Sequence, residues 1–133
     1  MMMLESAHAE KTKFFWTLHK RTVKNFMDIL ILSELIKTPL SGYDVITSIY
    51  RKFNFLPSSG SVYSLLCALE RRGLVKGGWN ERKRIYVLTQ KGEEIVEAAA
   101  TAHGKIEDLI ARIFSNRFSD FPINKNEYKL LQS

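Results

Sequence analysis

The stretch from residue 58 to residue 89 constrains the fold of this 133-residue chain more than any other part. Its first half carries apolar side chains three and four residues apart, which predicts an amphipathic helix over residues 58–72. Gly73 then ends the helix, and two short apolar stretches follow on either side of a polar turn at 80–84. These residues are therefore expected to form a helix followed by a two-stranded β-ribbon. The expected buried stripe of the helix is Val62, Leu65, Leu66 and Leu69, and the expected inner face of the ribbon is Val75, Trp79, Tyr86 and Leu88.

Two more helices are predicted immediately before this unit. Residues 23–37 show apolar positions at helical spacing, and Pro39 interrupts them because proline disfavours helical backbone in the residue before it. Ser41 can cap the next helix, with Asp44 placed favourably in its first turn. The buried faces are expected to comprise Phe26, Ile29, Leu30, Leu32 and Ile36 in the first helix, and Tyr43, Ile46 or Val45, Ile49 and Tyr50 in the second.

The two ends of the chain are predicted to add helices to this core. An N-terminal helix is expected over residues 10–20, after a frayed start at 1–9, and Thr89 is expected to cap a long final helix. Three helices, a ribbon and a further helix, joined by short loops, are typical of a winged helix-turn-helix protein. The predicted class is mainly α with a small β-ribbon. Its expected parts are an N-terminal helical extension at 1–22, a winged-helix domain at 23–89, a C-terminal helix at 90–116 and a tail at 117–133.

The charge of the chain is segregated along the sequence. The whole chain carries a formal charge of +6, residues 58–92 carry +5, and residues 93–114 carry −3. A positive field on the helix–ribbon unit suits the phosphate backbone of double-stranded DNA, with the helix in the major groove and the ribbon beside it. The candidate DNA-binding residues are Ser59, Ser61, Tyr63, Ser64, Arg71, Arg72, Arg82, Lys83 and Arg84.

These candidates are expected to divide into two kinds of contact. The outer face of the helix begins with small hydroxylated residues, which can approach base edges and phosphates closely, whereas the basic ribbon tip is expected to contact phosphates. Two alternatives remain open at this point. The serines can instead serve as helix caps, and Tyr63 can be a packing residue.

The final helix carries a repeat that predicts a dimer. Six apolar residues follow one another at alternating spacings of four and three, which is the seam of a coiled coil: Ile95, Ala99, Ala102, Ile106, Leu109 and Ile113. A helix that starts at Thr89 rises about 36 Å by residue 113, so its far half is expected to bury its stripe on a second copy of the chain.

Three aromatic residues, Phe14, Phe15 and Trp16, adjoin one another in the N-terminal helix. Three consecutive side chains cannot all face one core. They are expected either to pack within their own domain or to line a pocket for a partner or a small aromatic effector at a subunit interface.

Catalysis is not expected from this chain. It has no glycine-rich phosphate loop, no nucleophile elbow and no paired metal-ligand spacing, so neither an enzyme activity nor a metal or other cofactor is predicted. Its apolar runs fall far short of the roughly 18 residues that a membrane span requires, and its start does not resemble a secretory signal. The single cysteine, Cys67, fits a reducing compartment, so we expect a cytoplasmic protein.

Several segments together resemble the PadR family of winged-helix transcriptional regulators. They are LSGYDVI at 40–46, GSVYSLL at 60–66, LERRGLV at 69–75, RIYVLT at 84–89 and Lys91-Gly92, within a match from about residue 26 to residue 113. The resemblance implies a dimeric repressor whose third helix enters the major groove. It is to the short form of the family, in which a single C-terminal helix makes the dimer. Ser64 departs from the family, which often has proline there, and the effector varies among family members.

The expected function is therefore transcriptional regulation, as a homodimeric repressor on a two-fold symmetric operator. An architectural or chromatin-type DNA-binding protein with little sequence preference is one alternative. A protein-interaction adaptor on a winged-helix scaffold is the other, although the three basic residues at 82–84 have no purpose in an adaptor.

Overall fold

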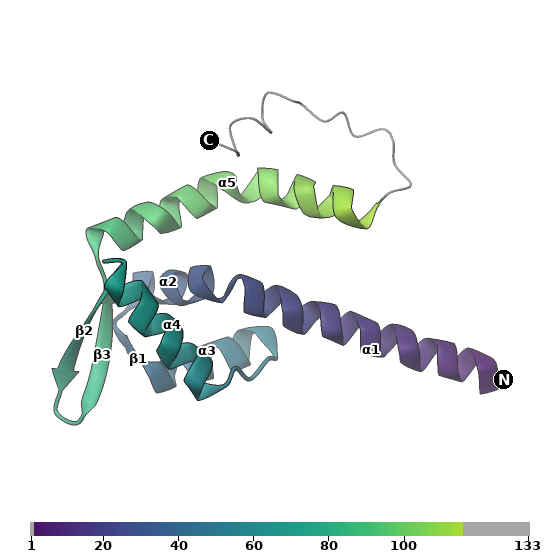
Figure 1. The fold of residues 1–133 in the computed structure, drawn as a ribbon, viewed down its shortest axis with the longest axis horizontal. Helices are drawn as coiled ribbons and strands as arrows, with labels where there is room; N and C mark the ends of the chain where they lie inside the picture. Colours follow the sequence, from purple (N-terminus) through teal and green to yellow (C-terminus); the bar gives the residue numbers. More distant parts are fainter. Residues whose placement is uncertain (1, 116–133) are drawn as a thin grey trace. The chain divides into compact units, whose positions relative to one another are not determined.

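The computed structural model describes residues 2–115 and confirms a mainly α-helical protein with a small antiparallel sheet (Figure 1). The tail predicted at 117–133 lies outside the described residues. The helices are α1 Met2–Asn25, α2 Met27–Lys37, α3 Gly42–Phe53, α4 Ser59–Arg71 and α5 Gln90–Phe114, and the strands are β1 Leu40–Ser41, β2 Val75–Asn80 and β3 Lys83–Leu88. No helix among the described residues is long and apolar enough to cross a membrane.

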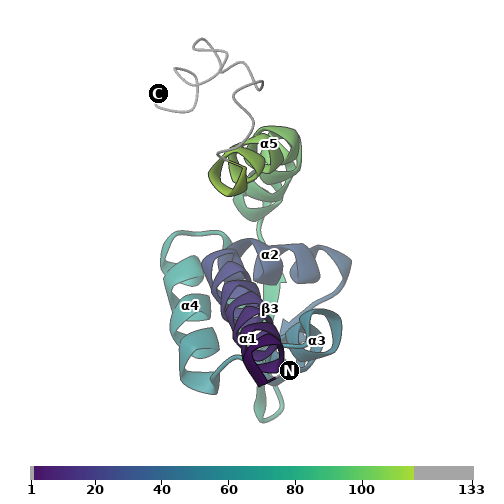
Figure 2. The same ribbon diagram turned by 90° about the vertical axis from the view of Figure 1, so that its right-hand side faces the viewer.

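The chain divides into two compact units, of which the first ends at Ala98 and the second begins at Ala99. The first unit holds α1 to α4, the sheet and the start of α5, and we call it the winged-helix unit. Seen from the side, α2, α3 and α4 surround its core, and β3 lies behind them (Figure 2).

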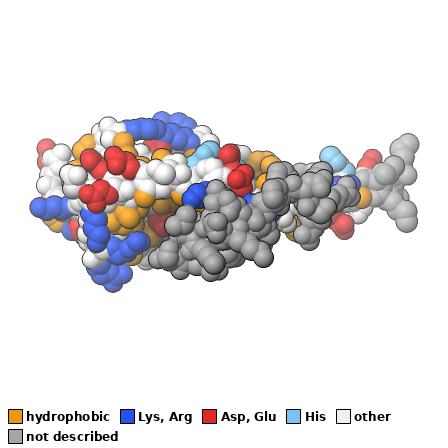
Figure 3. Space-filling model, turned by 90° about the horizontal axis from the view of Figure 1, so that it is seen from above, with side chains coloured by type: hydrophobic (Ala, Val, Ile, Leu, Met, Phe, Trp, Pro, Cys, Tyr) orange, Lys and Arg blue, Asp and Glu red, His pale blue; other side chains and the backbone are white. Residues whose placement is uncertain are grey.

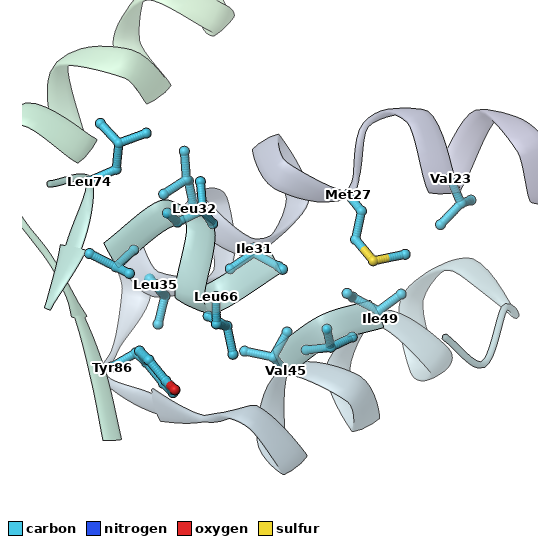
Figure 4. Packing of buried hydrophobic residues seen from close by; sticks show 13 residues of the cluster. Val23, Met27, Ile31, Leu32, Leu35, Val45, Ile49, Leu66, Leu74 and Tyr86 are labelled. Carbon is cyan, nitrogen blue, oxygen red and sulfur yellow. The ribbon is translucent and has the colours of Figure 1, made fainter. Parts of the chain in front are cut away.

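The core of this unit is made by side chains from α2, α3, α4 and the base of the ribbon, joined by Val23 at the end of α1 (Figure 4). The helix breaks after Lys37 and after Phe53 lie where the sequence predicted them, whereas the break between α1 and α2 lies at residue 26 rather than before residue 23. The buried residues are Val23, Met27, Ile31, Leu32, Leu35, Val45, Ile49, Val62, Leu66, Leu69, Leu74, Val75 and Tyr86.

The predicted buried face of α2 was partly wrong. Phe26 and Ile36 are exposed, whereas Met27, Ile31 and Leu35 are buried together with the predicted Leu32. The cause is a turn at residue 26, which ends α1 and lets α2 begin at Met27. Eight of the eleven residues from 26 to 36 are apolar, so spacing alone cannot decide which stripe faces the core.

The start of α3 follows the prediction, but its buried face does not. Ser41 and Asp44 form a capping box, in which the Ser41 hydroxyl accepts from the Asp44 amide and the Asp44 carboxylate accepts from the Ser41 amide. Hydrogen bonds from Ser41 accordingly lower the pKa of Asp44. Val45 and Ile49 are buried, but Tyr43 and Tyr50, which were expected inside, are exposed. The core contacts α3 along a narrower stripe than the sequence indicated.

The N-terminal helix is longer than predicted. It begins at Met2 rather than near Glu10, so the frayed start expected over residues 1–9 is wrong for residues 2–9. This segment contains methionine, leucine, glutamate and alanine, which all favour helical backbone.

The sheet has the order β1-β3-β2, with a short strand β1 that the sequence did not reveal. Leu40 pairs with Tyr86 and Ser41 with Ile85, while β2 and β3 pair along their whole length to form the ribbon. The predicted inner face is correct at Val75, Tyr86 and Leu88. Trp79 shares that face but is 70% exposed, because it pairs with Arg84 near the ribbon tip, beyond the edge of the core.

The end of α4, the base of the ribbon and the start of α5 meet at one junction. Gly73 leaves α4 with a positive φ of 76°, and the Thr89 amide returns at the other end of the ribbon to donate to the Leu74 carbonyl at 3.1 Å. The Thr89 hydroxyl accepts from the Gly92 amide at 3.1 Å, which confirms the predicted cap of α5. Gly92 lies so close to this turn that a Cβ atom there would overlap the Leu74 carbonyl oxygen.

We expect Gly92→Ala to lower the free energy of unfolding by about 1–3 kcal/mol, because the added methyl group meets rigid backbone. Gly104→Ala is the control in the same helix, since a Cβ there meets no atom within 4 Å. It should raise stability by about 0.5–1 kcal/mol through helix propensity. Thermal unfolding followed by circular dichroism measures both effects. If the two changes stabilised the protein equally, the close packing of Gly92 on the Leu74 carbonyl would be wrong.

Candidate nucleic-acid interface

Helix α4 has a buried stripe and a free outer face. Val62, Leu66 and Leu69 are fully buried, and Leu65 is half-buried. The opposite face is exposed, as predicted, and carries Ser59, Ser61, Tyr63, Ser64 and Cys67. The helix therefore presents small hydroxylated residues, one aromatic ring and a thiol to the outside.

The serines at the start of α4 differ in the hydrogen bonds that they make. Ser58 caps the helix by accepting from the Ser61 amide at 3.2 Å, and the hydroxyls of Ser58 and Ser61 lie 2.6 Å apart. The capping alternative therefore applies to Ser58 directly and to Ser61 in part. Ser59 and Ser64 lie on the exposed surface next to this cap.

Tyr63 lies where α4 meets the start of α3. Its ring packs so closely on Gly42 that a Cβ atom at residue 42 would overlap the ring carbons. The side chain is nevertheless 44% exposed. Tyr63 thus packs against α3 and also presents part of its ring to the outer surface of α4.

The ribbon tip is a tight turn at Glu81 and Arg82, between strands that end at Asn80 and start at Lys83. Glu81 adopts a positive φ of 58°, and Arg82 and Lys83 are both exposed. The predicted turn at 80–84 is therefore shorter than expected. Arg84 belongs to β3 rather than to the tip.

Arg84 has an internal partner that the sequence did not reveal. Its Nη2 atom lies 2.7 Å from Oε1 and 3.0 Å from Oε2 of Glu70, near the end of α4. The guanidinium also lies over the rings of Trp79 and Tyr86, at 5.9 and 5.7 Å from their centres. The Glu70 carboxylate raises the pKa of Arg84 above its ordinary value. Arg84 is thus paired within the chain, whereas Arg82 and Lys83 are exposed at the tip.

A hollow of about 400 Å³ lies between α4, the start of α3 and the ribbon. It brings together four of the predicted residues, Tyr63, Arg82, Lys83 and Arg84. It also contains Tyr43 and Trp79, which the sequence analysis had assigned to buried faces. Their exposure follows from tertiary packing, so helical or strand periodicity could not have identified them. The lining also includes Ser41 and Tyr86.

A second hollow, of about 860 Å³, lies along the other side of α4 and includes Ser61 and Ser64. Lys20 and Lys24 of α1 lie at its rim, although neither was among the predicted residues. Arg71 and Arg72 are exposed at the opposite, C-terminal end of α4. Basic side chains are visible at the end of the molecule that carries the ribbon (Figure 3).

The predicted coiled-coil seam of α5 changes character along its length. Ile95 packs against the core of the winged-helix unit. Ala99, Ala102 and Ile106 are half-buried, whereas Leu109 and Ile113 are 40% and 65% exposed. The last turns of α5 therefore present large apolar side chains at the surface.

The N-terminal aromatic residues are also exposed. Phe14, Phe15 and Trp16 are 64%, 60% and 46% exposed, so packing within the chain leaves much of each ring uncovered. Phe15 and Trp16 contact each other edge to face at 5.6 Å, and both contact His19. The His19 ring in turn lies 2.6 Å from the Phe53 carbonyl oxygen, which joins α1 to the end of α3. Phe15, Trp16 and His19 thus form one cluster of rings on α1.

Three helices (α2, α3 and α4) lie around a small sheet, and the ribbon projects beside the exposed face of α4. This arrangement defines the winged-helix class. The model of the transcriptional regulator PadR-like family matches residues 31–98, which is more than half of the chain. The protein belongs to this family, as its sequence segments indicated.

Solved structures with the same fold come from several organisms. A transcriptional regulator from Clostridium thermocellum is 21% identical, with a TM-score of 0.65 over 71% of this chain and 95% of that one. A PadR family transcription regulator from Clostridium difficile is 26% identical, with a TM-score of 0.60 over 66% and 97%. A third, from Eggerthella lenta, is 18% identical, with a TM-score of 0.65 over 84% and 98%. No curated protein matches the chain.

We expect Tyr63→Ala to lower operator affinity by about 1–3 kcal/mol if the ring or hydroxyl contacts a base. The same change should lower the free energy of unfolding by about 1–2 kcal/mol, because part of the ring packs on Gly42. Tyr63→Phe is the matched control, since it keeps the ring and removes the hydroxyl. Normal operator binding by a folded Tyr63→Ala protein would show that α4 is not oriented as proposed.

Proposed function

We propose that this transcriptional regulator is a repressor that binds double-stranded DNA as a homodimer on a two-fold symmetric operator. The observation that carries the proposal is the exposed outer face of α4 beside a ribbon with basic residues at its tip. This unit also concentrates the positive charge of the chain, with +5 over residues 58–92. Because its partner is DNA, the proposal places the protein in the cytoplasm.

In this arrangement α4 enters the major groove, and the ribbon follows the adjacent backbone. Ser59, Ser61, Tyr63 and Ser64 face the bases or the nearest phosphates from the start of α4. Arg71 and Arg72, about three turns further along the helix, contact the backbone. Arg82 and Lys83 contact phosphates from the tip, where charge is supplied with little geometric control.

The dimer is proposed to form through α5. Leu109 and Ile113 continue the predicted seam and are exposed in the single chain, so a second copy would cover them. The exposed rings of Phe14, Phe15 and Trp16 are a second apolar surface for the partner, or for a small aromatic effector. A two-fold dimer presents two copies of α4 to one face of DNA, about 34 Å apart.

Two alternative functions use the same scaffold. An architectural protein would bind all duplexes with similar affinity, and an adaptor would not bind DNA. The exposed Arg82 and Lys83 at the tip favour a DNA-binding function over an adaptor. Selection of bound fragments from genomic DNA tests the proposal directly, because a repressor enriches one symmetric sequence and an architectural protein enriches none.

Replacing Arg82 and Lys83 together with glutamine should weaken binding to operator and random duplexes alike. The log–log dependence of affinity on salt should flatten by roughly one to two units per protomer, because each phosphate contact releases about one counterion. Lys11 and Lys13 of α1, replaced in the same way, provide a control with equal loss of charge outside the proposed interface. An unchanged salt slope for the tip variant would remove the ribbon tip from the binding surface.

The variant with Ile106→Glu and Leu109→Glu should be monomeric, because it places carboxylates in the proposed dimer contact. Its operator binding should be much weaker, since one protomer contacts only half of the site. Light scattering measures the mass, and circular dichroism confirms that the monomer is folded. A wild-type protein that is monomeric at micromolar concentration would contradict the proposed dimer.

A further inference from the structure

The ribbon projects from the winged-helix unit with little support along its outer half. Strand β1 pairs only with Ile85 and Tyr86, near the middle of β3. Val75 and Tyr86 at the base are buried, but the residues from 78 to 83 are all exposed. The outer half therefore lacks a packed layer that would determine its angle to α4.

Glu70 of α4 connects the helix to both strands of the ribbon. Its Oε2 atom accepts from the Gly77 amide of β2 at 2.6 Å, and its two carboxylate oxygens accept from Arg84 of β3. Both contacts to the carboxylate come from one nitrogen, Nη2, and the guanidinium plane also lies over the rings of Trp79 and Tyr86. A planar guanidinium with these contacts has a more defined orientation than a lysine on a flexible stem. Glu70 thus attaches two points of the ribbon to the helix that is proposed to enter the major groove.

Gly77 leaves the space that this attachment needs. A Cβ atom at residue 77 would lie 2.6 Å from Arg84 Nε and 2.9 Å from Glu70 Oε2. Any side chain there would displace the ion pair. The pairing of Glu70 with Arg84 therefore requires glycine at residue 77, where β2 lies close to α4.

The Arg84 guanidinium already has partners within the chain. Its Nη2 atom is paired with Glu70, and the guanidinium lies over the rings of Trp79 and Tyr86. A phosphate would have to replace the Glu70 carboxylate to bind Nη2 in the same way. Arg82 and Lys83, at the tip, are exposed and need no such exchange.

We propose that Glu70 is a positioning residue, which sets the angle of the ribbon to α4 through Arg84 and Gly77. Arg84 then acts as the internal counter-charge of Glu70 and does not bind phosphate. This inference rests on the proposed function, and it revises the role that the sequence suggested for Arg84. Rigid attachment matters because a ribbon that is already oriented loses less conformational freedom when it binds DNA.

Glu70→Gln distinguishes the two roles of Arg84 by the sign of its effect on DNA affinity. If Arg84 binds phosphate, the substitution releases its guanidinium and removes a nearby negative charge, so binding becomes tighter. If Glu70 positions the ribbon, operator binding weakens by about tenfold, which is the loss expected for a hydrogen bond to a charged group. Glu81→Gln is the matched control, because it removes the same charge at the exposed ribbon tip and should not weaken binding.

Trp79 provides a readout that needs no DNA. The chain has two tryptophans, so in a Trp16→Phe background the emission comes from Trp79 alone. Glu70→Gln should change the emission and lower the anisotropy of Trp79, because the guanidinium over its ring is no longer held. Glu81→Gln should leave both unchanged. The fluorescence measurement does not depend on operator binding. If the wild-type protein bound no DNA, the proposed function would be refuted, but the Trp79 signal would still test whether Glu70 positions the ribbon.

Circular dichroism and thermal unfolding establish whether Glu70→Gln folds. If it does not, Arg84→Lys replaces it, since lysine keeps the charge but lacks the planar guanidinium that contacts Glu70 and the two rings. The proposal predicts weaker operator binding with an unchanged salt slope for Arg84→Lys. Binding by either folded variant that is equal to or tighter than wild type, together with unchanged Trp79 anisotropy, would overturn the proposal.

Discussion

The junction between Leu74, Thr89 and Gly92 is the constraint on which the rest of the structure depends. Thr89 donates its amide to the Leu74 carbonyl and caps α5 through its hydroxyl, so the two ends of the ribbon and the start of α5 are held together. Lys91 adds a hydrogen bond to the Arg72 carbonyl at the end of α4. One small cluster of backbone contacts therefore fixes the base of the ribbon next to the helix proposed to read DNA.

Two kinds of positive charge result from this arrangement. Arg82 and Lys83 lie at the end of the ribbon, where exposed charge favours long-range attraction to any duplex. Arg84, one residue later, lies against the helix and is neutralised by Glu70. Adjacent basic residues in a sequence can thus have different roles, because successive residues of a strand face opposite sides of the ribbon.

Local signals in the sequence predicted the element order and most helix ends. Ser41, Ser58 and Thr89 cap helices, and Gly73 ends one, through contacts within a few residues of each position or through backbone geometry. Tertiary packing determines which side chains are buried where the spacing of apolar residues does not. The apolar segment of α2 offers more than one buried stripe, and Tyr43 and Trp79 lie at the edges of elements where the core ends. The partner of Arg84 is 14 residues away in the chain, so no local pattern indicates it.

The central claim is that the exposed face of α4 reads a particular DNA sequence. The most direct test compares the affinity of the wild-type protein for its selected operator with that for a scrambled duplex of equal length, at physiological salt. The account predicts an affinity ratio of about 10³ or more, as is typical of sequence-specific regulators. A ratio near one would contradict it and would indicate a protein that binds DNA without regard to sequence.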